Sequence, residues 1–155
     1  MILCVGKLRE RFLREAADEY RKRLTRYGHV EEIEIPDMPE PTRPSAALEE
    51  EVRRREGERL LQALRPGDHV IALCIDGRQY DSPTFAARMR ALRDQGRRVV
   101  LVIGGSLGLS EAVIARADER LSLSAMTFPH QLARVLLLEQ LYRACKISAN
   151  ERYHK

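Results

Sequence analysis

The chain has 155 residues, 44% of them hydrophobic, which is enough for one compact domain that needs no disulfide or metal for stability. No apolar run approaches the roughly 20 residues that cross a bilayer, and charged residues follow the first apolar run at once, which excludes a membrane span and an export signal. Lysine and arginine exceed aspartate and glutamate by 27 to 23, a basic balance that suits an RNA partner but is equally typical of a solvated surface. We expect a single cytoplasmic domain over residues 1–155.

The cysteines predict no bridge and no metal site. Cys4, Cys74 and Cys145 are odd in number, lie far apart among apolar residues and form no CxxC pair. No histidine stands at a zinc-ligand spacing from them. We therefore predict buried, unpaired thiols and no bound metal.

The first predicted elements are a strand, a helix and a second strand. Residues 1–5 are apolar and end at Gly6, and apolar residues recur at helical spacing over residues 10–27. Residues 30–35 then alternate apolar and acidic side chains, the pattern of a strand with one buried face.

A proline-rich connection and a charged helix come next. The prolines at 36, 39, 41 and 44 predict an irregular segment. Ser45 suits the N-cap of a helix that runs to about residue 64, before a turn at Pro66-Gly67.

The second half of the chain carries the two most apolar runs. Residues 70–75 and 99–103 are typical of strands covered on both faces, and Ser82-Pro83 begins a helix between them that extends to about residue 94.

The remaining elements follow a glycine-rich segment, residues 104–108. A helix begins near Ser110, residues 121–126 form the last predicted strand, and Pro129 begins a final helix with a rich apolar face. The polar tail of residues 148–155 ends the chain.

This alternation of five strands and five helices predicts an α/β protein with a doubly wound, Rossmann-like parallel sheet, the two most apolar strands at its centre. Ligands of such sheets bind beyond the carboxyl ends of the strands. Here those ends are Asp76-Gly77, Gly104-Gly105 and residues 124–128, which we expect to converge on one site.

The glycine segment admits two interpretations. Glycines let a backbone pass close to a ligand, but residues 104–108 lack both the GxGxxG spacing and the Lys-Ser ending of phosphate-binding loops. A plain strand-to-helix turn that needs glycine accounts for them equally well.

The final helix offers several candidate polar residues. His130 and Arg134 lie four residues apart on one helix face and could hold a phosphate or a base, or His130 could cap a turn while Arg134 pairs with Glu139 or meets solvent. Glu139 lies among leucines on the same helix. We favour an ion pair between its carboxylate and Arg143, four residues later, over a desolvated carboxylate with a functional role.

The tail, Asn150-Glu151-Arg152-Tyr153-His154-Lys155, combines an aromatic ring, an imidazole and two cations. Such a segment can stack on a base and hold a phosphate, although most chain ends are merely solvated. From the residues alone, we predict a ligand-binding α/β domain and nothing more specific.

Longer sequence motifs allow a more specific prediction. The segments LVIGGSLGLSEAV, LSLSAMTFPHQLARVLLLEQLYRA and NERYHK, supported by GERLL, IALCIDGRQYDS and the early Gly6-Lys7, resemble the ribosomal RNA large subunit methyltransferase H (YbeA) family over essentially the whole chain.

This resemblance implies the SPOUT fold, an α/β fold with a deep C-terminal trefoil knot, a homodimer, and S-adenosylmethionine as cofactor. The knot would be an exception to the rule against threaded chains. The cofactor contacts carried over by the resemblance are Leu73, Gly104, Gly105, Leu123, Ser124, Ala125, Met126, Thr127 and Phe128.

The resemblance also implies an acceptor, the N3 atom of a pseudouridine in 23S rRNA of the assembled ribosome. That nitrogen carries an acidic proton, so histidines or cations nearby would be chemically useful. Our hypothesis for the base-binding side, with both protomers contributing, comprises His154, Tyr153, Lys155, His130 and Arg134.

Two positions depart from the family pattern. Ser106-Leu107 replaces a pair such as Pro-Glu in the glycine loop, so any acidic role there is lost although backbone contacts would survive. Lys155 ends the chain where arginine is common, which keeps the charge but loses a bidentate fork.

Two other functions fit the same residues. One is a ribosome-associated RNA-binding factor without turnover, which would bind no S-adenosylmethionine. The other is a flavodoxin-like nucleotide-binding module, which would be purified with a bound nucleotide or flavin.

Overall fold

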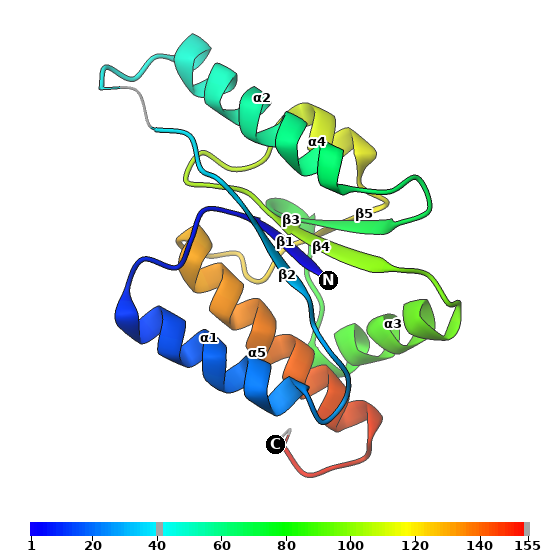
Figure 1. Ribbon diagram of the computed structural model, residues 1–155. Helices are drawn as coiled ribbons and strands as arrows, with labels where there is room; N and C mark the ends of the chain where they lie inside the picture. Colours follow the sequence, from blue (N-terminus) through cyan, green and yellow to red (C-terminus); the bar gives the residue numbers. More distant parts are fainter. Residues whose placement is uncertain (40–41, 154–155) are drawn as a thin grey trace.

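A computed structural model describes residues 1–39 and 42–153, in which helices and strands alternate along the chain (Figure 1). The elements are β1 (Ile2–Val5), α1 (Arg11–Leu24), β2 (Glu32–Ile35), α2 (Ala46–Ala63), β3 (His69–Arg78), α3 (Ser82–Asp94), β4 (Val99–Ile103), α4 (Glu111–Arg116), β5 (Glu119–Leu121) and α5 (His130–Ser148).

The strands form one five-stranded sheet in the order β2-β1-β4-β3-β5, and every pairing between neighbours is parallel. The predicted α/β class and parallel sheet are therefore confirmed. The apolar strand β4 is the middle strand and β3 lies beside it, as expected for strands whose side chains are buried on both faces.

Helices cover both faces of the sheet, with α1, α3 and α5 on one side and α2 and α4 on the other (Figure 1). Successive residues of a strand point to opposite faces. In β1, Ile2 and Cys4 accordingly join the core beneath α1 and α5, whereas Leu3 and Val5 join the core beneath α2. The core therefore has two layers, one on each side of the sheet.

Short polar side chains begin three of the helices. Ser45 accepts a hydrogen bond from Leu48 N (3.3 Å), and Ser110 accepts one from Val113 N (3.5 Å), so both predicted N-caps are confirmed. The cap of α3 is Asp81, which accepts from Thr84 N at 2.7 Å, one residue before the predicted start.

The last strand differs from the prediction. The pattern indicated residues 121–126, but β5 is Glu119–Leu121 and the chain then leaves the sheet. Ser122 Oγ donates to Ser124 O (2.8 Å), and Ser124 Oγ accepts from Met126 N (3.0 Å). These local bonds offer the backbone an alternative to the strand ladder, so residues 122–129 form a connecting segment instead.

Candidate functional site

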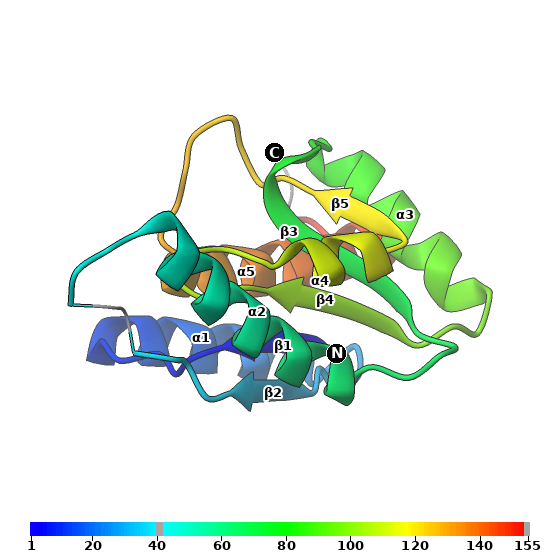
Figure 2. The same cartoon turned by 90° about the horizontal axis from the view of Figure 1, so that it is seen from above.

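The carboxyl ends of β4, β3 and β5 meet at one edge of the sheet, because the three strands are adjacent and parallel. Two connecting segments begin there, residues 104–110 after β4 and residues 122–129 after β5. The second one arches away from the sheet before it enters α5 (Figure 2). We call this the carboxyl edge.

The segment after β4 folds back on itself. Gly108 N donates to Gly105 O at 3.1 Å, and these two glycines form an isolated bridge. A Cβ atom on Gly104 would lie 2.6 Å from the Gly108 carbonyl carbon, and Gly108 has a φ of +84° that other residues rarely adopt. The turn therefore explains these glycines locally, and a cofactor role for Gly104 and Gly105 stays a prediction.

The segment after β5 is the more exposed of the two. Met126 is 74% exposed, Ala125 and Thr127 are exposed, and Leu123, Ser124 and Phe128 are half-buried. Leu73, half-buried in β3, pairs with Leu121 just before this segment. The topology thus brings all nine residues expected to contact the cofactor to the carboxyl edge.

The start of α5 lies at the same edge. His130 is the first residue of the helix and is half-buried. The neighbouring Gln131 accepts a hydrogen bond from Arg9 N at 2.9 Å, which fixes the connection between β1 and α1 against the start of α5. The fold therefore places His130 near the predicted cofactor residues.

The Arg134 side chain points toward the edge strand β2. Its side chain is 4% exposed, and it makes ion pairs with Glu32 (2.7 Å) and Glu34 (2.8 Å) of the edge strand β2. Burial opposes its charge, but these carboxylates leave the pKa of Arg134 raised. Neither alternative considered for this residue, a pair with Glu139 or solvent, occurs. Glu139 instead pairs with Arg143 at 2.6 Å, which confirms the preferred interpretation of that carboxylate.

The tail folds back against the second half of α5, from Glu139 onward. The Tyr153 ring lies edge-on to Tyr142 with centroids 4.9 Å apart, and its hydroxyl donates to Glu139 Oε1 at 3.2 Å. Burial and the Glu139 carboxylate raise the pKa of Tyr153. The tail residue Glu151 accepts a hydrogen bond from Tyr27 at 2.9 Å. The other predicted tail residues, His154 and Lys155, lie outside the described residues.

Within one chain, about half of α5 separates Tyr153 from the carboxyl edge. Residues 122–129 precede the first residue of α5, whereas Tyr153 follows its last. The Tyr153 ring folds back onto Tyr142 and Glu139, which lie twelve and nine residues after His130, about 14 to 18 Å along the helix at 1.5 Å per residue. The fold brings together His130 and the predicted cofactor residues, but not Tyr153.

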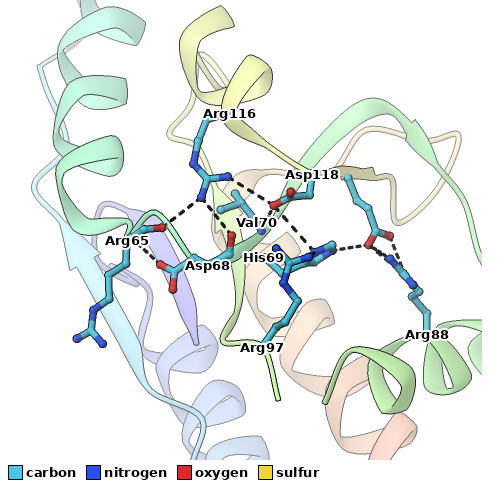
Figure 3. Close-up of polar contacts among 9 residues, drawn as sticks. Arg65, Asp68, His69, Val70, Arg88, Arg97, Arg116 and Asp118 are labelled. Atoms are coloured by element: carbon cyan, nitrogen blue, oxygen red, sulfur yellow. Dashed lines mark hydrogen bonds and ion pairs between the residues drawn. The ribbon is translucent and has the colours of Figure 1, made fainter. Parts of the chain in front are cut away.

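The opposite, amino edge of the sheet holds a dense polar cluster (Figure 3). His69 is 5% exposed, and its Nε2 lies 2.5 Å from Glu119 Oε1, which Arg88 also binds. Arg97 approaches the other ring nitrogen at 3.4 Å, and Asp118 accepts from Val70 N at 2.8 Å. Because these groups satisfy one another, we assign the cluster a structural role.

Sequence reasoning missed one buried group at the carboxyl edge, the carboxylate of Glu56, which is 4% exposed in α2. The available signal was its neighbour Gly57, because a glycine inside a helix is costly unless another segment must approach closely. A Cβ atom on Gly57 would come within 3.0 Å of Ser110 Cβ.

Residues 1–39 and 42–153 contain no metal site and no membrane-spanning helix. No group of three histidine, cysteine or carboxylate side chains there could hold a metal ion. No helix in the same ranges has the length and apolar character needed to span a bilayer.

The sequence and the fold both match known proteins. The family model described as predicted SPOUT methyltransferase matches residues 1–154. The solved structure of a probable methyltransferase from Bordetella pertussis Tohama I superimposes with a TM-score of 0.57 at 19% identity, covering 93% of this chain and 92% of that one. At this identity the likeness speaks for the fold alone.

Curated relatives are much closer in sequence. Proteins named ribosomal RNA large subunit methyltransferase H are 52% identical in Bifidobacterium animalis subsp. lactis and 46% identical in Exiguobacterium sibiricum, each covering 99% of this chain and 98% of the relative. The same name belongs to a protein of Desulfitobacterium hafniense that is 53% identical over 99% of this chain and 97% of its own length.

These findings define the class as that of the SPOUT methyltransferases. Within it, the chain belongs to the ribosomal RNA large subunit methyltransferase H family, as its motifs predicted.

Proposed function

We propose that this protein is a cytoplasmic, S-adenosylmethionine-dependent methyltransferase that methylates N3 of a pseudouridine in 23S rRNA of the assembled ribosome. The observation that carries the proposal is the arrangement of the carboxyl edge in a chain of this family. Residues 104–110 and 122–129 begin at adjacent parallel strand ends, where ligands of such sheets bind.

The residues at this edge suit the cofactor chemically. The half-buried side chains of Leu73, Leu123 and Phe128 offer apolar surface for an adenine ring, and the glycine turn offers backbone amides and carbonyls for its edge. S-adenosylmethionine supplies a methyl group that its positive sulfur already activates. The protein must therefore chiefly bind the donor, align the acceptor nitrogen and manage one proton.

We place the acceptor beside His130, at the start of α5, where the helix N-terminus favours a developing negative charge. Removal of the imide proton from N3 makes the nucleophile, and positive or hydrogen-bonding groups there would stabilise the anion. Arg134 enters this proposal only as a residue that holds α5 to β2, because two carboxylates already bind its guanidinium.

The tail would reach the site from a second copy of the chain. Tyr153 packs on Tyr142 and Glu139, away from its own carboxyl edge, so a homodimer that sets two α5 helices side by side in opposite directions would bring each tail to its partner's loops. Such a dimer also doubles the basic surface that meets RNA. In the same family-based proposal, the C-terminal part is threaded into a trefoil knot and residues 1–155 form a single domain.

The pair Ser106-Leu107 is compatible with this function. Ser106 is exposed and Leu107 half-buried, and neither takes part in the hydrogen bond between Gly108 and Gly105 that shapes the turn. We therefore assign no catalytic role to an acidic group at position 107.

The test is transfer of a labelled methyl group from S-adenosylmethionine to ribosomes that contain the pseudouridine but lack its methyl group. Digestion to nucleosides should place the label on that pseudouridine. Donor binding without transfer would indicate a different RNA substrate, whereas no donor binding at all would contradict the methyltransferase and favour the RNA-binding factor. We expect protein-free stem-loop RNA to be a poor substrate, and efficient methylation of it would contradict the proposed ribosomal substrate.

A further inference from the structure

The carboxylate of Glu56 lies beneath the glycine turn of the carboxyl edge. Glu56 belongs to α2, on the face that packs over the sheet next to Leu60. Burying a charged carboxylate is costly unless hydrogen bonds and close partners compensate. A residue of this type at 4% exposure therefore calls for a specific set of contacts.

Those contacts join two segments that are distant in sequence. Glu56 Oε1 accepts a hydrogen bond from Met38 N at 2.9 Å, in the connection between β2 and α2. The same carboxylate touches the glycine turn, because a Cβ atom on Gly105 would lie only 2.9 Å from Oε2 and 3.4 Å from Oε1. Any residue other than glycine at position 105 would thus displace the carboxylate or the turn.

The next residue of α2 holds the other end of the same segment. Gly57 lies so close to Ser110 that its own Cβ would fall within 3.0 Å of the Ser110 Cβ. Ser110 is the N-cap of α4, which begins where the turn ends. Two successive residues of α2, Glu56 and Gly57, therefore contact the beginning and the end of the segment 104–110.

We propose that Glu56 is a positioning residue for donor binding. It holds the backbone of Gly105 in the conformation that receives S-adenosylmethionine and links this backbone to the Met38 connection. This inference rests on the proposed function of the carboxyl edge. The carboxylate acts through the turn rather than on the acceptor, because it is buried and one of its oxygens already accepts an amide hydrogen.

The test compares Glu56→Ala with Glu56→Gln in the full chain. The amide oxygen of glutamine can still accept from Met38 N, so Glu56→Gln should bind the donor about as tightly as the wild type. Glu56→Ala leaves that amide without its acceptor, so we expect its donor Kd to rise roughly tenfold, with kcat at saturating donor changed far less. The matched control is Glu58→Ala, because Glu58 is exposed on the same helix and pairs with Arg54.

A second readout needs no donor. Gly108 N donates to Gly105 O at 3.1 Å, so hydrogen exchange at Gly108 reports how firmly the turn is held. Exchange should be faster in Glu56→Ala than in the wild type and near normal in Glu56→Gln. If the wild type binds no donor, the proposed function fails, yet this readout still decides whether Glu56 holds the turn.

A double variant probes the contact directly. Gly105→Ala should weaken donor binding by forcing the new methyl group onto the carboxylate, whereas the same change in a Glu56→Ala background should cost less, because only the Val5 methyl group, at 3.2 Å, then remains close. A folded Glu56→Ala protein with unchanged donor Kd and unchanged exchange would overturn the proposal. So would a Glu56→Gln protein that loses kcat at unchanged Kd, since that pattern indicates proton transfer by the carboxylate.

Discussion

Arg134 Nε lies 2.7 Å from Glu32 Oε2, and this buried ion pair ties α5 to the edge strand of the sheet. Arg21 of α1 binds the same carboxylate, with its second nitrogen 3.0 Å from Oε2. One glutamate of β2 thus holds both helices that lie side by side on this face (Figure 1).

Loss of Arg134 should destabilise the protein without a comparable effect on donor affinity. Arg134→Met leaves two carboxylates short of a partner, and breaking a buried pair in this way costs about 3 kcal/mol. Urea unfolding gives this value, and calorimetric titration of S-adenosylmethionine gives the Kd. The control is Arg11→Ala, which removes an ion pair whose arginine is 84% exposed and should change little. A donor Kd that rises strongly in a stable Arg134→Met protein would indicate that Arg134 contributes to the donor site.

The stability that Glu32 supplies should depend on pH. Burial would raise the pKa of its carboxyl group, but hydrogen bonds and charges from Arg21 and Arg134 outweigh it and hold the pKa below the ordinary 4.5. A lowered folded-state pKa stabilises the protein above the unfolded pKa, and this contribution is lost as the pH falls through the folded value. The stability difference between wild type and Glu32→Gln should therefore be full at neutral pH and shrink below about 4.5.

Unfolding curves at several pH values measure that difference. The same series on Glu15→Gln serves as control, because the Glu15 carboxylate is 62% exposed in a surface ion pair and should contribute little throughout. A Glu32→Gln difference that stays constant down to pH 3 would contradict the assigned cause.

His69 should matter for stability and not for donor binding. It lies at the amino edge, where Glu119 and Arg97 face its two ring nitrogens (Figure 3). His69→Ala removes these contacts and leaves a small cavity, so we expect a loss of about 2 kcal/mol in unfolding free energy. Donor Kd should stay within about twofold, since the predicted cofactor residues lie at the opposite edge. The exposed His29→Ala is the control for stability.

Mixing two inactive variants tests whether the tail acts in its partner's site. Gly104→Ala should disable the donor loop, since the added Cβ would lie 2.6 Å from Gly108 backbone atoms. A chain that ends at Glu151 lacks Tyr153, His154 and Lys155 but keeps the anchoring bond of Glu151 to Tyr27.

Each of these variants alone should transfer little methyl, whereas refolding the two together should restore activity. The mixed dimer then contains one site with an intact loop and its partner's intact tail. Absence of recovery in a verified mixed dimer would indicate that loop and tail serve the same protomer.

The sequence by itself determined the α/β class, the order of the elements and the family. Continuous apolar runs at 70–75 and 99–103 indicate strands buried on both faces, and Ser45 and Ser110 mark helix starts through local hydrogen bonds. The expected cofactor residues come from the family motifs, because a motif of this kind reflects both a local backbone shape and the side chains on it.

Tertiary structure alone decided the rest. Arg134 looks like a free partner for an anion at helical spacing from His130, yet it is held by β2, about a hundred residues earlier in the chain. Glu56 looks like one more charge on a polar helix until folding presses it against Gly105. Pairings of this kind depend on which faces meet across the sheet, and residue periodicity, which describes one element at a time, does not contain that information.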